Sequence, residues 1–395
     1  MQRHFWMGIS LVLTGIFIAS NLYTMLPLQK ELSETFHVSI AQASLASTFF
    51  ILPYAIGLFC FGLLADRFSH KRLLLTGMAC LTIVTLLVGM APYYWLFLLL
   101  RGFQGVLAAS FAPTAFAYTF QHFQGKQQAF VIAMINTGFL FAGIFGQMIA
   151  VYLTGAGDSY QTVYVGFFFF YLLCLCSMAV TLIQSNKPIK KTRISISPIL
   201  SFFRFPPLLK LYGISFFLLM AVMMFYGSFE VYMTTDHISF PFSLQTFRLI
   251  GLIGILPAFF AGPLQQLYGA RSVLAAFLLC MTAGILLPLW TFGTITLVIA
   301  SIFMIASTSI TIPMVILLIG TFAKESRASA VSIYSFTLLT GASIGSILAA
   351  IMPFHFVLAC IGLTFASLSL LSLTIEKPPF LSQQTKQSEQ TTFSK

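Results

Sequence analysis

Charged residues are scarce in this chain of 395 residues: Asp, Glu, Lys and Arg together make up 7%, and only nine residues are acidic. Hydrophobic residues make up 58%, including 44 phenylalanines. A soluble domain of this length has too little interior to bury so much apolar surface. Because long apolar runs recur along the whole chain, we predict an all-α integral membrane protein that crosses the bilayer many times.

The sequence also lacks the motifs of several function classes. It has no Gly-x-x-x-x-Gly-Lys-Ser/Thr loop for ATP, no repeated pore loop typical of a channel, and no convergent set of nucleophiles, acids and bases. Its six cysteines all fall in apolar runs, without the spacing of a metal site. We therefore expect neither an enzyme nor a cofactor or metal site. A secondary carrier is favoured, and a membrane scaffold or a transport-dead sensor is the non-carrier alternative.

The apolar runs predict twelve transmembrane helices in two groups of six. The first group is expected at 7–28, 41–64, 73–91, 95–119, 129–153 and 162–184, and the second at 208–233, 244–267, 273–291, 294–319, 327–352 and 354–375. Crossing the hydrocarbon takes about 20 residues, which fits these lengths. The polar segments complete the division into an N-terminal bundle (1–184), a linker (185–207), a C-terminal bundle (208–376) and a polar tail (377–395).

Basic residues predict the orientation. All Lys and Arg residues except Lys30, Arg101 and Arg248 fall in segments that this division places on one side of the membrane. By the positive-inside rule that side is the cytoplasm, so a multi-pass protein of the cell membrane with both termini and the linker in the cytoplasm is expected. The basic residues thus indicate orientation rather than a nucleic-acid partner. The expected partners are a small-molecule substrate, protons and membrane lipids, and a monomer is expected.

The most specific motif lies in the polar turn between the second and third spans. It reads Gly-Leu-Leu-Ala-Asp-Arg-Phe-Ser-His-Lys-Arg over residues 62–72. The order G-x-L-x-D-R-x-x-x-K-R resembles the loop 2–3 motif of the major facilitator superfamily, with Ser69 where that motif usually has glycine. The resemblance implies two pseudo-symmetric six-helix bundles. It also implies a conformational latch, which stabilises one access state, made by Gly62, Asp66, Arg67, Lys71 and Arg72.

A second copy of this turn begins 200 residues later. Gly262 aligns with Gly62, Gln266 with Asp66, and Arg271 with Lys71. The copy therefore lacks the carboxylate and most of the charge of the first. A repeat of this kind is expected of parallel halves related by an axis along the membrane normal, with substrate bound between them.

The fourth span contains Arg101 and Gln104 between small residues Gly102 and Gly105. An arginine inside a membrane helix is costly and commonly faces protein or a water-filled cavity. The R-x-x-Q-G arrangement resembles the fourth-helix motif of the superfamily, which implies a link to proton coupling. The glycines permit close helix packing or access of water.

The fifth span has closely spaced glycines at Gly138, Gly143 and Gly146. This pattern resembles a degraded form of the glycine-rich motif of proton antiporters in the superfamily, with Gln147 in place of its proline. Such spacing predicts close packing or bending of the helix.

Other polar residues in the spans are candidates for the pathway of substrate or protons. They are Asn21 and Tyr23 in the first span, Tyr226 and Glu230 near the outer end of the seventh, Arg248 in the eighth and Tyr334 in the eleventh. Asn21 either lines the cavity or forms hydrogen bonds between helices. Glu230 is the one carboxylate expected within a helix, and it is either a coupling acid or an outer-surface residue. Arg248 either lines the cavity or extends to the membrane surface.

The resemblance as a whole is to the 12-span, proton-coupled efflux branch, and it implies export of a small molecule by alternating access. Intramembrane arginines without a carboxylate in the first six spans favour an anionic or zwitterionic cargo, for example a carboxylate-bearing metal chelator. Multidrug efflux of lipophilic compounds and proton-driven uptake are the alternatives.

Overall fold

The computed structural model describes residues 2–157, 159–184, 202, 204–235, 241, 243–324 and 326–376. Every regular element among these residues is helical. Twelve of the helical spans are long and apolar enough to cross a membrane, which confirms the predicted number. The expected linker, 185–207, lies mostly outside the described residues, and the tail from 377 onward lies wholly outside them.

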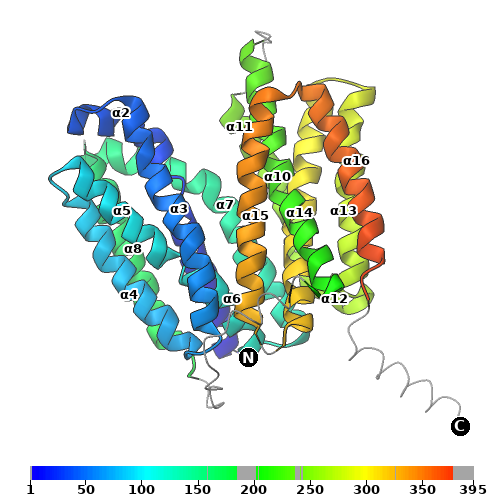
Figure 1. The fold of residues 1–395 in the computed structure, drawn as a ribbon, viewed down its shortest axis with the longest axis horizontal. Coiled ribbons are helices and arrows are strands. Elements are labelled where there is room, and N and C mark those ends of the chain that lie inside the picture. The colour runs from blue at the N-terminus through cyan, green and yellow to red at the C-terminus, as the bar shows by residue number, and fades with distance from the viewer. Residues whose placement is uncertain are drawn as a thin grey trace, which may run out of the picture.

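Two groups of helices stand side by side (Figure 1). The first half contains α1 (Gln2–Ser20), α2 (Met25–Phe36), α3 (Ile40–Ala65), α4 (His70–Gly89), α5 (Tyr94–Ala108), α6 (Phe111–His122), α7 (Gly125–Gly157) and α8 (Tyr160–Thr181). The second half contains α10 (Pro206–Thr235), α11 (Leu244–Gly251), η1 (Leu252–Phe260), α12 (Ala261–Tyr268), α13 (Ala270–Trp290), α14 (Thr294–Phe322), α15 (Arg327–Ile351) and α16 (Phe354–Leu373).

The first span is shorter than predicted. The sequence predicts one helix over 7–28, but α1 ends at Ser20 and a turn over 21–24 separates it from α2. Pro27 lies in the first turn of α2, a position where its missing N–H leaves no helical bond unmade. The polar Asn21 in the turn uses its side chain for tertiary contacts. Sequence periodicity does not reveal such a break, because the residues on both sides are apolar.

The eighth span is also broken. It consists of α11, the 3-10 helix η1 and α12, with Pro257 inside η1. Proline removes a helical hydrogen bond and crowds the preceding turn, which accounts for a change of helix type here. At the start of α11, the Ser243 hydroxyl accepts a hydrogen bond from the N–H of Thr246 (3.2 Å). This cap fixes where α11 begins and thereby the position of Arg248 on its second turn.

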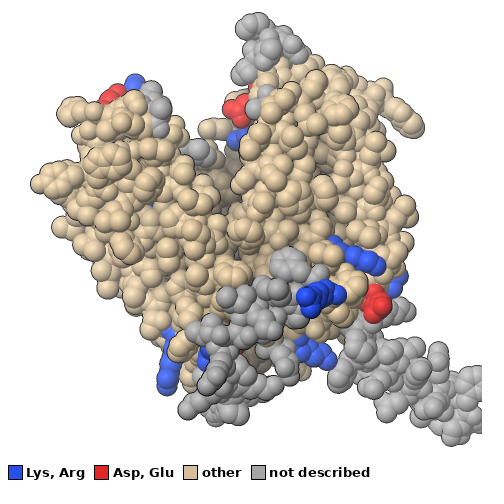
Figure 2. Space-filling view, in the orientation of Figure 1, with Lys and Arg blue, Asp and Glu red and all other residues tan. Residues whose placement is uncertain are grey.

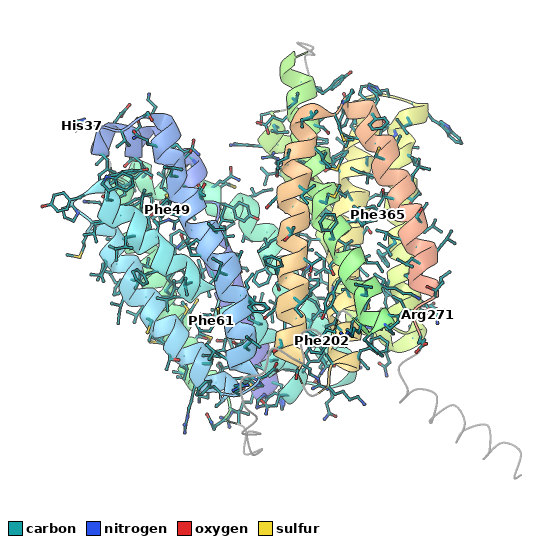
Figure 3. All side chains as sticks on the ribbon, viewed as in Figure 1. His37, Phe49, Phe61, Phe202, Arg271 and Phe365 are labelled. Carbon is teal, nitrogen blue, oxygen red and sulfur yellow. The ribbon has the colours of Figure 1, made fainter. Side chains whose placement is uncertain are left out.

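The repeated turn has matching contacts in the two halves. Lys71, at the start of α4, donates to the carbonyl oxygen of Leu182 just after α8 (2.7 Å). Arg271, which is labelled in Figure 3, lies at the start of α13 and donates to the carbonyl oxygen of Leu373 at the end of α16. Cations suit the carbonyl end of a helix. Lys71 and Arg271 therefore each bind the end of the last helix of their own half.

The halves meet at one end of the molecule and separate at the other. At the end that carries the N-terminus, which we call the latch end, α3 packs against α15 and α12 packs against α7 (Figure 1). At the opposite end, the open end, the space-filling view shows a cleft between the halves (Figure 2). The fold thus leaves a cavity between the halves that opens away from the latch end.

Candidate functional site

A cavity of about 440 Å³ lies between the two halves. The first half contributes residues from α1 and the turn after it, α3, α6 and α7, and the second contributes residues from α10, α11, η1, α14 and α15. Most of these side chains are aliphatic or aromatic, such as Phe116, Phe139, Met223, Ile305 and Ile312. The cavity therefore suits an apolar body.

Four of the residues predicted for the pathway line this cavity: Tyr23, Tyr226, Arg248 and Tyr334. Tyr23 and Tyr334 come from opposite halves, so the cavity wall is shared between them. Arg248 is the charged residue of the lining within the described residues. A single cation in an apolar wall is a strong local determinant of the charge of a ligand.

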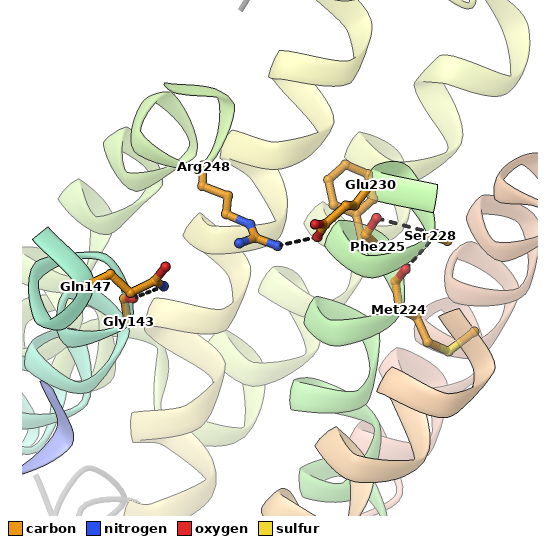
Figure 4. Close-up of polar contacts among 7 residues, drawn as sticks. All are labelled: Gly143, Gln147, Met224, Phe225, Ser228, Glu230 and Arg248. Atoms are coloured by element: carbon orange, nitrogen blue, oxygen red, sulfur yellow. Dashed lines mark hydrogen bonds and ion pairs between the residues drawn. The ribbon is translucent and has the colours of Figure 1, made fainter. Parts of the chain in front are cut away.

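The guanidinium of Arg248 is held by residues of α10 (Figure 4). Its Nη2 lies 3.4 Å from Oε2 of Glu230, and its Cζ lies 5.5 Å from the ring centroid of Tyr226. The Tyr226 hydroxyl is in turn 2.8 Å from Oγ of Ser301 on α14. Glu230 is thus neither isolated nor in the cavity lining: it pairs with the cation of the cavity from the side.

Two amide side chains on α7 line the cavity from the first half. Gln147 lines the cavity, and its Nε2 donates to the carbonyl oxygen of Gly143 (2.8 Å; Figure 4). Asn136 also lines the cavity, and its Nδ2 has no hydrogen-bond partner among the described residues. Sequence reasoning noted Gln147 only as a replacement for proline and did not select Asn136. A polar residue within an apolar run was the one available signal for both.

Arg101 lies elsewhere, buried in the first half and outside the cavity lining. Its Nη1 donates to Oδ1 of Asn21 (2.6 Å) and to Oε1 of Gln104 (2.7 Å), and its Cζ lies 4.4 Å from the ring centroid of Phe50. Asn21 also donates to the hydroxyl of Tyr171 (3.0 Å). The structure therefore brings Arg101, Gln104 and Asn21 together as a network that joins helices of one half.

Asp66 connects the halves at the latch end. Its carboxylate accepts hydrogen bonds from the N–H groups of Ala328 (3.0 Å) and Ser329 (2.9 Å) and from the Ser329 hydroxyl. These N–H groups belong to the first turn of α15, where a helix has unpaired donors and a partial positive charge. Burial raises the pKa of Asp66, and the hydrogen bonds from Ser329 and Ala328 offset only part of that effect.

The other residues of the predicted latch divide into two groups. Gly62 belongs to the contact between halves, because a side chain at this position would collide with Ser332 of α15. Lys71 binds the end of α8 within its own half. Within the described part of the chain, Arg67 and Arg72 make no side-chain hydrogen bond or ion pair.

Arg327 is a contact between halves that sequence reasoning missed. Its Nε donates to the carbonyl oxygen of Gly320 (2.9 Å), and its Nη1 donates to that of Phe120 in the first half (3.4 Å). The guanidinium also lies 5.1 Å from the ring centroid of Phe120. In the sequence, Arg327 differs in no visible way from the other basic residues at span ends.

The glycines predicted for helix packing also differ from one another. Gly105 and Gly146 lie against the backbone carbonyl oxygens of Phe50 and Ser20, where a Cβ would not fit, and a Cβ on Gly138 would lie 2.9 Å from Ile16. By contrast, the nearest atoms to a Cβ on Gly102 and Gly143 are 3.5 Å and 3.7 Å away, which is ordinary contact.

Comparisons with known proteins agree with this architecture. Residues 9–264 match the family model of the Major Facilitator Superfamily. The chain is 36% identical over 103 residues to protein spinster homolog 1 of Xenopus tropicalis, covering 25% of this chain and 20% of that protein. It is 30% identical over 118 residues to the sphingosine-1-phosphate transporter SPNS2 of the same species, covering 28% of this chain and 23% of that protein. The alignments thus span less than a quarter of these relatives.

The fold is similar to that of the E. coli fucose:proton symporter FucP, with a TM-score of 0.74 at 16% identity over 94% of this chain and 98% of that one. At this identity the likeness concerns the fold alone. The family match covers more than half of the chain, and it agrees with the motif at 62–72 and the twelve membrane-length helices. This protein therefore belongs to the major facilitator superfamily and is a multi-pass membrane protein.

Proposed function

We propose that this protein is a secondary transporter that moves a small amphipathic organic anion across the cell membrane by alternating access. The observation that carries this proposal is an apolar cavity with one cation, Arg248, in its described lining. An apolar body gains free energy when it leaves water for such a wall, at about 25 cal/mol per Å². A guanidinium favours a carboxylate, phosphate or sulfonate, which it can bind through two parallel hydrogen bonds.

One relative supports an amphipathic cargo with an acidic group. It is named as a transporter of sphingosine-1-phosphate, a molecule that carries a phosphate and an ammonium group on a long apolar chain. The apolar lining favours a cargo with one acidic group over the metal chelator suggested by the sequence, because a chelator carries several polar groups that would lose water here. We therefore propose the chemical class of the cargo, an amphipathic molecule with one acidic group.

We propose further that the latch end faces the cytoplasm of the cell membrane. Lys and Arg gather near this end in the space-filling view (Figure 2), and the positive-inside rule then places both termini in the cytoplasm. In this orientation the cavity is open to the outside, and the contacts of Asp66 and Arg327 close the route to the cytoplasm. Transport requires that these contacts break while the open end closes.

Proton coupling belongs to the proposal, and its sign decides the direction of transport. The resemblance to the efflux branch supports export in exchange for protons. The alternative is uptake together with protons. The ion pair between Arg248 and Glu230 supports it, because this pair places a carboxylate beside the cation of the cavity. Arg101 lies in the buried network of the first half, and we propose that it positions helices rather than binding cargo.

Transport by the purified protein in liposomes tests this proposal. Two labelled probes share one apolar body and differ in charge: 4-butylbenzenesulfonate and 4-butylphenyltrimethylammonium. We expect saturable uptake of the sulfonate and little uptake of the ammonium compound. Hydrogen bonds to charged groups contribute about 1.5–3 kcal/mol, so Arg248→Gln should lower kcat/KM for the sulfonate by about 10-fold or more.

The control is Lys30→Gln, which removes an exposed cation at the open end outside the cavity lining and should leave uptake unchanged. Preference for the ammonium compound would support the multidrug alternative, which the apolar lining also favours. Uptake of neither probe by folded protein would refute the proposal and leave a sensor or scaffold.

A further inference from the structure

We infer that Asn136 is a second recognition point of the cavity, where it binds a carbonyl group on the apolar part of the anionic cargo. The inference rests on the proposed function, in which Arg248 binds the acidic group of that cargo. It adds a chemical requirement, because the cargo must also carry a neutral hydrogen-bond acceptor. The cavity then selects molecules that present both groups at a suitable separation.

Asn136 lies on the cavity face of α7, at the inner end of that face. The residues of α7 that line the cavity are Asn136, Phe139, Leu140, Gly143, Ile144 and Gln147. Their spacing of three and four residues is that of one face of a helix. Because α7 begins at the latch end, where Gly262 of α12 packs on the backbone of Lys126, Asn136 is the innermost of these residues.

The amide of Asn136 lacks a partner within the described protein. The residue is 5% exposed, and its Nδ2 is closed off from water without a hydrogen bond among the described residues. Nearby side chains are aromatic: the ring of Phe139 meets the rings of Phe111 and Phe116 edge-on, at centroid distances of 6.5 Å and 6.3 Å. An N–H group without an acceptor in apolar surroundings is unfavourable. A ligand that supplies an acceptor therefore lowers the free energy of this donor.

The donor can turn towards the cavity without a change in the backbone. The torsion between Cβ and Cγ of an asparagine is broad and roughly two-fold, so a half turn exchanges the places of Nδ2 and Oδ1. This turn breaks no hydrogen bond, because the Asn136 side chain makes none among the described residues. The carbonyl oxygen of a ketone, ester or amide accepts from such an N–H. A hydrocarbon chain at the same place leaves the donor unpaired.

Gln147 provides a contrast on the same helix face. It lines the same cavity, but its Nε2 already donates to the carbonyl oxygen of Gly143 (2.8 Å), as Figure 4 shows. A ligand that bound Gln147 would replace one hydrogen bond by another, which changes the free energy little. A ligand that binds Asn136 makes a hydrogen bond that the protein otherwise lacks. The two amides of the cavity therefore have different roles.

The packing of α7 on α12 gives the separation of the two recognition points. Lys126 and Gly262 are in contact and so lie at the same depth. A rise of about 1.5 Å per residue places Asn136 about 15 Å from Lys126 along α7. The eighth span includes a 3-10 helix, with a rise of about 2.0 Å per residue, which places Arg248 about 24 Å from Gly262. Arg248 therefore lies roughly 10 Å nearer the open end than Asn136.

This separation and the lining define the cargo more closely. Between the two points the wall is formed largely by apolar side chains, such as Phe139, Leu140 and Met223. An apolar spacer therefore fits between the two polar groups of the cargo. The cargo class that meets both points is an elongated amphipathic acid with a ketone, ester or amide carbonyl roughly 10 Å from its acidic group.

Equilibrium binding of two sulfonates to the purified full-length protein tests the inference. One is 4-butylbenzenesulfonate, and the other, 4-(3-oxobutyl)benzenesulfonate, has a ketone in the same tail. An apolar wall alone favours the butyl compound, because the ketone loses water when it binds. The wild type should instead bind the ketone about 5-fold more tightly, the gain of one neutral hydrogen bond. Asn136→Leu should reverse this preference, and the matched control Gln147→Leu should keep it.

Thermal unfolding without ligand separates recognition from a structural role. Asn136→Leu removes an unpaired donor from apolar surroundings, so it should unfold at the wild-type temperature or above it. Asn136→Ala removes the same amide without adding a branched side chain and should give the same binding preference as Asn136→Leu. A lower unfolding temperature together with weaker binding of both sulfonates, in both variants, would show that Asn136 supports the fold and would overturn the inference.

The variants also separate the two proposals. If the wild type prefers the butyl compound, or if Asn136→Leu keeps the preference for the ketone, Asn136 does not recognise the cargo. Binding of both sulfonates that is weakened in Arg248→Gln would in that case still support the anion site. If Arg248→Gln binds both sulfonates as the wild type does, the proposed function fails and the inference fails with it.

Discussion

Removing the carboxylate of Asp66 should shift the protein towards states in which the latch end is open. Asp66→Ala leaves the N–H groups of Ala328 and Ser329 without their acceptors, and it leaves the Ser329 hydroxyl without a partner across the halves. The apolar spans on either side are untouched. The variant should therefore insert and fold normally while the distribution between access states changes.

The magnitude follows from two opposing terms. An unpaired buried donor costs about 1–3 kcal/mol, and because water can reach this half-buried turn we take the lower end for each of the two N–H groups. Alanine also removes a charge whose burial is unfavourable, as the raised pKa of Asp66 indicates, so part of that cost is offset. The net shift is about 1–2 kcal/mol, or about 5- to 30-fold in the ratio of open to closed latch.

Distances between spin labels across the latch end measure this ratio. Suitable positions are the exposed Arg72 on α4 and Tyr268 on α12, each replaced by cysteine in a protein whose native cysteines are removed. Asp66→Ala should move population to longer distances in lipid nanodiscs. Asp66→Asn keeps one acceptor and also removes the buried charge, so it should stay closer to the wild type than Asp66→Ala does.

The matched control uses the repeat. Gln266 occupies the position of Asp66 in the second half but is exposed, and it makes no described hydrogen bond or ion pair with the first half. Gln266→Ala should leave the distances unchanged. Identical distance distributions for wild type and Asp66→Ala would refute the reasoning, because the hydrogen bonds to α15 would then contribute nothing to closure.

Three further predictions concern other parts of the molecule. Burial raises the pKa of Asp66 in the closed latch above its value in water, so the closed latch binds a proton more tightly than the open one. In spin-label measurements the closed state should therefore gain population as pH falls through that raised pKa and lose it again as pH rises. Asp66→Asn should show no such dependence on pH. Gly146→Ala should lower thermal stability by about 1–3 kcal/mol through overpacking, whereas Gly143→Ala, which has room for a Cβ, should unfold as the wild type does. Arg101→Gln should lower the melting temperature but leave sulfonate affinity unchanged, and an affinity loss without a stability loss would instead indicate a cargo contact.

The spans could be predicted because hydrocarbon imposes one requirement on every segment that crosses it. Length and hydropathy predicted all twelve spans. The repeat also aligned Lys71 with Arg271, and in the structure each of them donates a hydrogen bond to the end of the last helix of its half, α8 or α16. The turn at Asn21 was not predictable. Its cause is a set of contacts with Arg101 and Tyr171, which come from distant spans.

The site could be predicted only in part, since a sequence shows that a polar residue lies in a span but not which way it faces. Arg101 and Arg248 look alike in the sequence, yet one is buried within a half and the other lines the cavity. The partner of Asp66 could not be predicted for a similar reason. Ser329 lies 263 positions away, and what Asp66 recognises there is mainly backbone at a helix start, which carries no residue signature.

The central claim is that Arg248 receives the acidic group of an amphipathic anion in the cavity. Locating 4-iodobenzenesulfonate by the anomalous scattering of its iodine, in crystals of the protein, tests this claim directly. We expect the sulfonate within hydrogen-bond distance of the Arg248 guanidinium, with the iodinated ring directed into the apolar cavity beside Tyr226 and Met223. A sulfonate bound at Arg101, or at the latch end with the cavity unoccupied, would contradict the account.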